Sequence, residues 1–224
     1  MAERPARRTI ARVRSEQLTF LGADALLDLH QRTRDLERRG RDGVIVEAGC
    51  ARGGSALVVA GAKAPSRAMY VYDVFGMIPP PTDEDGSDVH ERYEVIVKGD
   101  AGPGYYGYES NLREQVHDAF DRYGLPPEEH NVHLVEGRYE DTLRLDDPVV
   151  LAHIDCDWYA SVMTCLIRLE PLLVPGGVMV IDDYNVWSGA RRAVDEYFAD
   201  KGARFRFRHG ARLQIERRTT GDRS

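Results

Sequence analysis

The sequence has few of the features that mark secreted, membrane-embedded or nucleic-acid-binding proteins. Its three cysteines, Cys50, Cys156 and Cys165, form no CxxC pair, and an odd number fits reduced thiols in a cytoplasmic protein. No apolar run approaches the roughly 20 residues that a membrane span needs. The net charge of −7 argues against nucleic acid as the main partner. We therefore expect a cytoplasmic protein with no membrane and no nucleic-acid partner.

The chain of 224 residues is long enough for one α/β domain with a sizeable core, which we place at residues 23–217. The N-terminus has no apolar stretch behind its arginines, so it is not a secretory signal. We expect residues 1–22 to form an arm that is solvated or contacts another subunit, with a polyanion-binding arm as the alternative. Its positive charge comes from Arg4, Arg7, Arg8, Arg12 and Arg14. Residues 218–224 are expected to be a disordered tail.

Segments of strand and helix character alternate along the chain. The expected strands are 43–48, 68–73, 132–136, 149–155 and 178–182, and the expected helices are 23–39, 53–63, 109–123, 159–169 and 188–199. We expect Ser188 to cap the last helix and segments 204–208 and 212–216 to form a hairpin. Five β-α units and a hairpin predict an α/β fold with a mostly parallel, seven-stranded sheet. This Rossmann-like layout resembles the class I methyltransferases that use S-adenosylmethionine (SAM), and the final hairpin favours them over dinucleotide-binding folds.

Residues 75–110 interrupt this alternation. The segment is rich in proline, glycine and tyrosine, and its apolar residues follow no regular period. Long irregular insertions in compact domains are usually functional lids or disordered segments. We expect a lid that is mobile without ligand and orders over the acceptor.

A glycine-rich turn follows the first expected strand. The stretch from Glu47 through Gly49 and Gly53 to Ser55 has the spacing E-x-G-x-x-x-G-G-S, which differs from the G-x-G-x-x-G of dinucleotide sites. Glycines at such a turn let the backbone approach a ligand, although a tight packing turn is the alternative. The spacing resembles motif I of the SAM methyltransferases, in which the acid helps to organise the methionine end. Asp73 closes the second strand, where a carboxylate can accept hydrogen bonds from two ribose hydroxyls.

The third expected strand leads into Gly137, Arg138 and Tyr139. In a class I methyltransferase this position lies beside the adenine, so we include Arg138 and Tyr139 among the cofactor-binding residues. Tyr139 can cover the adenine ring, with a core aromatic as the alternative interpretation.

Acidic residues follow the fourth and fifth strands. Because neighbouring parallel strands end at the same edge of a sheet, Asp155, Asp182 and Asp183 are expected to converge. Three adjacent carboxylates repel unless they take up a proton or surround a cation, and their hard oxygen atoms suit Mg²⁺. Separate solvated strand ends are the alternative. A metal-polarised hydroxyl needs a base, for which Asp155 and Asp157 are the candidates. His153 is expected to be a hydrogen-bonded core residue.

Together these stretches resemble the macrocin O-methyltransferase family, which methylates sugar hydroxyls in actinomycete antibiotic pathways. The matching segments are 47–55, Asp73 with 75–76, 137–143, 155–161 and 175–184. The resemblance implies SAM, a small-molecule acceptor, a Mg²⁺ site of Asp155, Asp182 and Asp183 in which Asp155 also serves as the base, a mobile lid and a homo-oligomer.

Three other functions remain open at this point. Catechol methyltransferases share the three-acid site but place a lysine base three residues after the first acid, where this chain has Trp158. The tryptophan favours an aliphatic hydroxyl over a phenol. A non-catalytic SAM-binding module has no need of converging carboxylates, and the glycine spacing disfavours a nicotinamide oxidoreductase.

Overall fold

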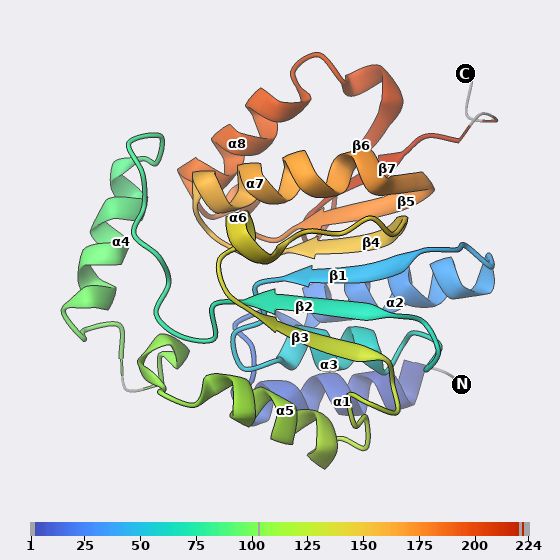
Figure 1. Cartoon of the computed structure of the whole chain (residues 1–224), viewed down its shortest axis with the longest axis horizontal. Coiled ribbons are helices and arrows are strands. Elements are labelled where there is room, and N and C mark those ends of the chain that lie inside the picture. The colour runs from blue at the N-terminus through green and yellow to red at the C-terminus, as the bar shows by residue number, and fades with distance from the viewer. Residues whose placement is uncertain (1–2, 103, 220, 222–224) are drawn as a thin grey trace.

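The computed structural model describes residues 3–102, 104–219 and 221. Its centre is a seven-stranded sheet in the order β3-β2-β1-β4-β5-β7-β6 (Figure 1). The strands are β1 Val44–Ala48, β2 Met69–Asp73, β3 Val132–Glu136, β4 Val149–Ile154, β5 Leu173–Ile181, β6 Phe205–His209 and β7 Leu213–Arg217. The first five are parallel and β7 runs antiparallel to β5 and β6. The expected fold class is confirmed.

Helices cover both faces of the sheet. The first layer holds α1 Glu3–Ser15, α2 Ala23–Arg38, α3 Gly54–Ala60 and α5 Leu112–Arg122, and the second holds α6 Tyr139–Thr142, α7 Tyr159–Leu169 and α8 Ser188–Phe198. Short 3-10 turns are η1 Tyr106–Tyr108, η2 Glu170–Leu172, η3 Asp183–Asn185 and η4 Gly202–Arg204. Alternate residues of β1 enter the two cores: Ile45 packs against the first layer, whereas Val44 and Val46 pack against the second. The sheet is therefore buried on both sides.

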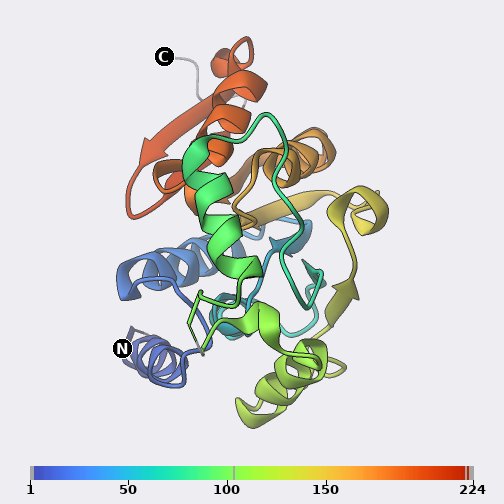
Figure 2. The same cartoon turned by 90° about the vertical axis from the view of Figure 1, so that its left-hand side faces the viewer.

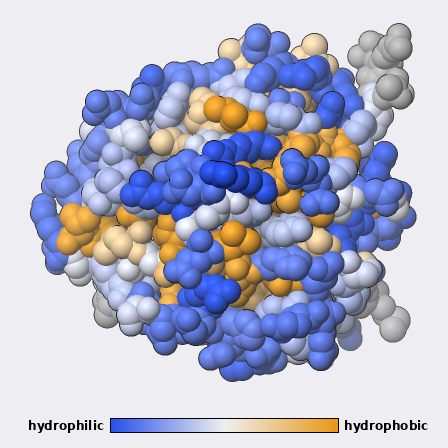
Figure 3. Space-filling model, in the orientation of Figure 1, coloured by the Kyte–Doolittle hydropathy of each residue, from blue (hydrophilic) through white to orange (hydrophobic). Residues whose placement is uncertain are grey.

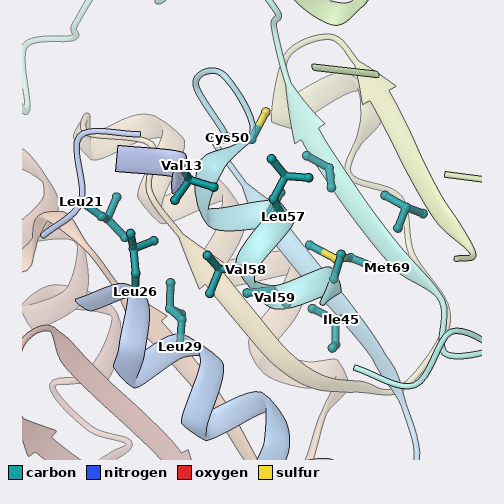
Figure 4. Close-up of a cluster of buried hydrophobic side chains, with 14 of the residues drawn as sticks. Val13, Leu21, Leu26, Leu29, Ile45, Cys50, Leu57, Val58, Val59 and Met69 are labelled. Atoms are coloured by element: carbon teal, nitrogen blue, oxygen red, sulfur yellow. The ribbon is translucent and has the colours of Figure 1, made fainter. Parts of the chain in front are cut away.

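The N-terminal segment differs from the solvated arm that the arginines suggested. Residues 3–15 form α1, whose apolar side chains Ala6, Ile10 and Val13 recur at helical spacing and are buried. Val13 belongs to the same apolar cluster as Leu26 of α2 (Figure 4). The arginines occupy the remaining faces of the helix, which explains why composition alone resembled a tail.

The expected irregular insertion contains a regular helix. α4, Ser87–Val97, lies at the left of Figure 1, beyond the arrowheads of β1 and β2, and crosses the front of Figure 2. A small apolar cluster forms beneath it, with Val89 and Ile96 of the helix against Tyr105 and Trp158. Only this narrow stripe of α4 is buried, so the apolar period was too weak to predict the helix.

Two further details correct the sequence-based expectations. β5 begins at Leu173, five residues earlier than expected, because Leu173 already pairs with Val149 of β4. The register then shifts over the Pro175–Gly177 stretch before regular pairing resumes at Val178. Ser188 is the first residue of α8 rather than its cap, and the N-cap position belongs to Trp187.

The surface in Figure 3 is mainly hydrophilic with separate hydrophobic patches. Among the described residues, no helix combines the length and apolar character that a membrane crossing requires.

The expected tail lies partly outside the described residues, since 220 and 222–224 are not among them. Arg218 bonds through its amide to the carbonyl of Arg204 at 2.9 Å.

Candidate active site

The carboxyl ends of the central strands form one continuous edge. The hydrogen-bond ladder extends one residue beyond β1, β4 and β5, where the amides of Gly49, Asp155 and Asp182 donate to carbonyls of neighbouring strands at 2.9, 2.8 and 2.9 Å. This register places the glycine-rich turn directly beside the acidic residues. The convergence expected from strand order is therefore present.

The glycine-rich turn is shaped by backbone conformations that few residues adopt. Gly49 has φ +88°, and a Cβ atom there would lie 1.8 Å from the carbonyl oxygen of Asp155. Ala51 and Gly53 also have positive φ, at 49° and 86°. Only a residue without a side chain fits at Gly49, so the turn keeps a bare backbone edge against which a ligand can pack.

Asp73 ties this turn to the start of the lid. Its two carboxylate oxygens accept hydrogen bonds from the amides of Cys50 and Phe75, each at 2.8 Å. Burial raises the pKa of Asp73, and the two amide donors oppose that rise. Asp73 lines a small cavity with Gly49 and Tyr139, which fits the expected contact of these three residues with the cofactor.

Glu47 and Ser55 lie beneath the turn rather than on its cavity side. The Ser55 hydroxyl donates to Oε1 of Glu47, and Oε2 of this fully buried carboxylate has no hydrogen-bond partner in the described part of the chain. Nδ1 of His153 lies 3.1 Å from Glu47 Oε1. Burial alone would lower the pKa of His153, but the carboxylates of Glu47 and Asp182 raise it well above the usual value. His153 is a core residue, as expected, but within the described residues its ring nitrogens face these two carboxylates without forming the expected hydrogen bonds.

The two residues expected beside the adenine are placed differently. Tyr139 is buried and lines the small cavity. Arg138 keeps 54% of its side chain exposed and pairs with Glu140 at 3.5 Å. Neither of the two cavities at this edge of the sheet is lined by Arg138. Gly53 also lies outside both linings; it is the N-cap residue of α3 and faces Val116.

Three carboxylates gather where β4 and β5 end. One oxygen each from Asp155, Asp182 and Asp183 lies within 4.8 Å of the others, a spacing at which they could hold a metal ion. Burial and the neighbouring carboxylates raise the pKa of Asp155 and of Asp183 well above the usual range. Burial also acts on Asp182, but His153 and Arg212 outweigh it and lower the pKa of Asp182. The Nε atom of Arg212 donates to Asp182 at 2.5 Å. This donor set suits a hard divalent cation.

Asp157 is held beside this cluster by two contacts. Its Oδ1 accepts a hydrogen bond from Nε1 of Trp187 at 2.8 Å, and its amide donates to Asp183 at 3.0 Å. Burial raises the pKa of Asp157 to about 6, although the hydrogen bond from Trp187 opposes the rise. The carboxylate is consequently fixed in direction and still largely ionised at neutral pH.

A larger cavity of about 280 Å³ joins these groups. Its walls come from the acidic cluster, the lid, the loop between α1 and α2, and Cys50 and Ala51 of the glycine-rich turn. Asp155 and Asp157 line both this cavity and the smaller one, so they stand where the two meet. An acceptor in the large cavity and a cofactor against the glycine turn would therefore meet at these two carboxylates.

Several lining residues were not predicted from the sequence. They are Phe20, Arg92, Tyr105, Tyr106, Trp187 and Arg212. All lie in the loop before α2, in the lid or beyond the acidic strand ends, where side chains follow no period. The tyrosines of the insertion and the tryptophan four residues after Asp183 were the available signals.

Comparisons with known proteins identify the family. Residues 3–206 match the family described as Macrocin-O-methyltransferase (TylF). The chain belongs to this family. The match begins at α1, so it covers more of the chain than the segments that carried the resemblance in the sequence.

Individual relatives agree with this assignment. Demethyldecarbamoylnovobiocin O-methyltransferase of Streptomyces niveus is 28% identical over 193 residues, covering 81% of this chain and 68% of the relative. The 8-demethyl-8-(2,3-dimethoxy-alpha-L-rhamnosyl)-tetracenomycin-C 4'-O-methyltransferase of Streptomyces olivaceus is 30% identical, covering 80% and 67%. The solved O-methyltransferase NovP superposes with a TM-score of 0.76 at 25% identity, covering 90% of this chain and 82% of NovP. This chain is thus a SAM-dependent O-methyltransferase.

Proposed function

We propose that this methyltransferase holds Mg²⁺ on Asp155, Asp182 and Asp183 and methylates a sugar hydroxyl of a small polar acceptor. The observation that carries the proposal is the convergence of the three carboxylates on the cavity next to the glycine turn. A family of O-methyltransferases needs a hydroxyl acceptor at that junction. A non-catalytic SAM-binding module would have no use for buried, mutually repelling acids.

The three carboxylates repel one another, and a divalent cation bound between them would offset that repulsion. Burial and mutual repulsion raise the pKa of Asp155 and of Asp183, so a cation between these carboxylates would stabilise their charged forms. When bound, Mg²⁺ supplies Lewis acidity that makes a coordinated hydroxyl easier to deprotonate. His153 and Arg212 keep Asp182 ionised, so one ligand stands ready in its charged form.

We propose that Asp157 is the base that accepts the proton of the acceptor hydroxyl, and that Asp155 serves as a metal ligand. Asp157 borders both cavities, and Trp187 and Asp183 fix its direction. With a pKa of about 6, its carboxylate is ionised near neutral pH yet basic enough to accept a proton. A base at the meeting point of the cavities can remove the proton as the acceptor oxygen aligns with the SAM methyl group, and that alignment lowers the barrier further.

The acceptor is assigned to the sugars on two grounds. The names of the tetracenomycin and novobiocin relatives describe methylation of a rhamnosyl-tetracenomycin and of demethyldecarbamoylnovobiocin. In this chain Trp187 and the exposed Phe20 line the large cavity, and flat aromatic rings suit the apolar faces of a sugar or an aglycone. Trp158 occupies the position of the phenol-type lysine base, so a catechol acceptor is disfavoured.

The lid is proposed to order the catalytic loops as well as cover them. Trp158 and Trp187 hold the N-cap positions of α7 and α8, and neither provides a side-chain cap. Two lid carboxylates serve instead: Asp85 accepts from the amide of Tyr159 at 2.8 Å, and Asp88 accepts from the amide of Ser188 at 2.9 Å. These helices directly follow the loops that carry the acids, so lid closure fixes the acids in place.

A radiochemical methyl-transfer assay tests the function. Sugar nucleotides, glycosylated metabolites and one catechol would be screened with labelled SAM, in Mg²⁺ and in EDTA. We expect methylation of a sugar-bearing acceptor that stops in EDTA and returns with Mg²⁺. Full activity of a verified metal-free sample would overturn the metal site, and methylation of the catechol alone would overturn the acceptor class.

A further inference from the structure

The lid helix turns one basic side chain, Arg92, toward the large cavity. Val89, Arg92 and Ile96 follow one another at helical spacing on α4, and the two apolar members are buried. Arg92 is partly buried and lines the large cavity. It therefore lies across from the acids, on the wall that the lid supplies.

The guanidinium of Arg92 lacks the partner that a cavity-lining charge normally has. Within the described ranges Arg92 forms no ion pair at 4.0 Å or less, although its charge opposes the rise that burial causes in the pKa of Asp157 in the same cavity. The other arginine of the cavity, Arg212, is paired with Asp182 at 2.5 Å. A charge enclosed by a ligand without a partner is costly. Because an acceptor in this cavity would displace water from Arg92, it must compensate that charge.

Tyr105 provides a second polar group at the same place. Its ring centroid lies 5.9 Å from the guanidinium carbon of Arg92. Its hydroxyl is buried and, among the residues described, has no hydrogen-bond partner, although Tyr105 lines the large cavity. Burial and Asp157 raise the pKa of Tyr105 to about 12, so the hydroxyl keeps its proton and can donate it. A buried donor without an acceptor is costly unless a ligand supplies one.

We propose that Arg92 and Tyr105 form a subsite for an anionic group of the acceptor, a carboxylate or a phosphate. The proposal rests on the proposed function, because it names a property of the same acceptor. The guanidinium offers paired donors to two oxygens of such a group, and the Tyr105 hydroxyl offers a third donor. The acids on the opposite wall repel the anionic group and keep it at Arg92. The uncharged hydroxyl of the same acceptor is then directed toward Asp155 and Asp157.

The small cavity that contains Gly49, Asp73 and Tyr139 is lined by neither Arg92 nor Tyr105, which is the ground for assigning the anion to the acceptor. The large cavity also includes Cys50 and Ala51 of the glycine-rich turn, so the cofactor approaches the same space. The carboxylate of SAM is nevertheless an anion that a lid arginine could reach, so the experiment must separate the two sources.

Calorimetry on the full-length protein with S-adenosylhomocysteine and Mg²⁺ provides the test. The probes are two pairs of compounds that differ mainly in charge: D-glucuronate with D-glucose, and thymidine diphosphate with thymidine. We expect the anion of at least one pair to bind about tenfold more tightly than its neutral partner. The pair that shows the preference identifies the group as a carboxylate or a phosphate.

Variants assign the preference to the subsite. Arg92→Gln should abolish it, Arg92→Lys should keep part of it, and Tyr105→Phe should weaken anion binding several-fold. Lys98→Gln is the matched control, because Lys98 follows the same helix, pairs with exposed Glu94 at 3.0 Å and does not line the large cavity formed by the described residues. It should leave the preference unchanged.

Three results would overturn the inference. The first is equal binding within both pairs. The second is a preference that survives Arg92→Gln, which would assign the anion to the metal site. The third is weaker S-adenosylhomocysteine binding by Arg92→Gln, which would assign the guanidinium to the cofactor. Failure of the wild type to bind S-adenosylhomocysteine would instead count against the cofactor site itself.

Discussion

The two halves of the active site are built on different principles. At the ends of β1 and β2 the backbone makes the site: Gly49 packs against a carbonyl of Asp155, and Asp73 is bound by two amides. At the ends of β4 and β5 the site is made by charged side chains, which are held by distant segments of the chain. Arg212 bonds to Asp182, and Asp85 of the lid bonds to the first amide of α7. The first half suits a cofactor of constant shape. The second can change its acceptor by changing side chains, and we expect it to respond to ions.

Gly49→Ala should produce the largest effect, because the backbone half has no room to adjust. The new Cβ would lie 1.8 Å from the Asp155 carbonyl oxygen, at a residue with φ +88°. We expect the free energy of unfolding to fall by about 3 kcal/mol, from the left-handed conformation and the overlap together. S-adenosylhomocysteine binding should become undetectable. Urea denaturation and calorimetry measure the two quantities.

Gly124→Ala is the matched control for this substitution. Gly124 follows α5 with φ +69°, and no heavy atom lies within 4 Å of its added Cβ. It should lose only about 1 kcal/mol of stability and bind S-adenosylhomocysteine normally. If both variants bound the ligand equally well, close approach at Gly49 would not be what shapes the cofactor half.

The charged half should instead respond in a graded way that ions can modify. Asp183→Asn removes a metal ligand, so raised Mg²⁺ should restore part of the activity. Asp157→Asn removes the proposed base, so kcat should fall about 10²- to 10⁴-fold and excess Mg²⁺ should not restore it. Mn²⁺ binding, followed by electron paramagnetic resonance, should weaken in Asp183→Asn and change little in Asp157→Asn.

Cofactor binding is the control for both aspartate variants. S-adenosylhomocysteine should bind both of them with near wild-type affinity, since the glycine turn lies on a neighbouring strand. If excess Mg²⁺ restored the activity of Asp157→Asn, Asp157 would contribute to metal binding and would not be the base.

The sequence was sufficient for the parts of the fold that repeat a local period. The mostly parallel sheet, the hairpin and the convergence of Asp155, Asp182 and Asp183 follow from alternating segments and from where parallel strands end. The glycine turn was predictable because its spacing reflects a backbone constraint at Gly49. Each of these features is recognised from a pattern within a single segment, although the strands then pair across long stretches of the chain.

The remaining features depend on contacts between distant residues. Asp85 contacts Tyr159 across 74 positions, and Asp88 contacts Ser188 across 100. No local pattern reports such a pair. Ser188 was expected to cap α8 because serine often does so, but Asp88 of the lid performs this role. α1 was missed because its arginines obscured three buried apolar residues.

Removing a lid carboxylate that caps α7 or α8 should have an intermediate effect, and it should affect the acceptor half of the site but not the cofactor half. Asp85→Ala leaves the Tyr159 amide without its acceptor and should cost about 1 kcal/mol of lid docking. We expect KM for the acceptor to rise roughly tenfold, with S-adenosylhomocysteine binding unchanged. Hydrogen exchange should show faster exchange in residues 79–98 and at the start of α7.

Asp195→Ala is the control for the lid variant. Asp195, on the exposed face of α8, accepts a hydrogen bond from the Tyr184 hydroxyl at 2.8 Å and occupies no helix N-cap position. Its KM and exchange pattern should match the wild type. Equal exchange in Asp85→Ala and in the wild type would mean that the cap does not hold the lid.

The smallest effect is expected at Arg138, where the sequence-based prediction and the observed geometry diverge. The residue was expected beside the adenine, yet its side chain is exposed, pairs with Glu140 and lines neither cavity. An exposed ion pair contributes little, so Arg138→Ala should change the Kd for S-adenosylhomocysteine by less than about twofold. Tyr139→Leu keeps an apolar side chain in the small cavity but removes the ring, and should weaken binding about fivefold if the ring covers the adenine. A larger loss in Arg138→Ala than in Tyr139→Leu would mean that the guanidinium swings onto the cofactor when it binds, and that the cofactor half depends on a charged side chain after all.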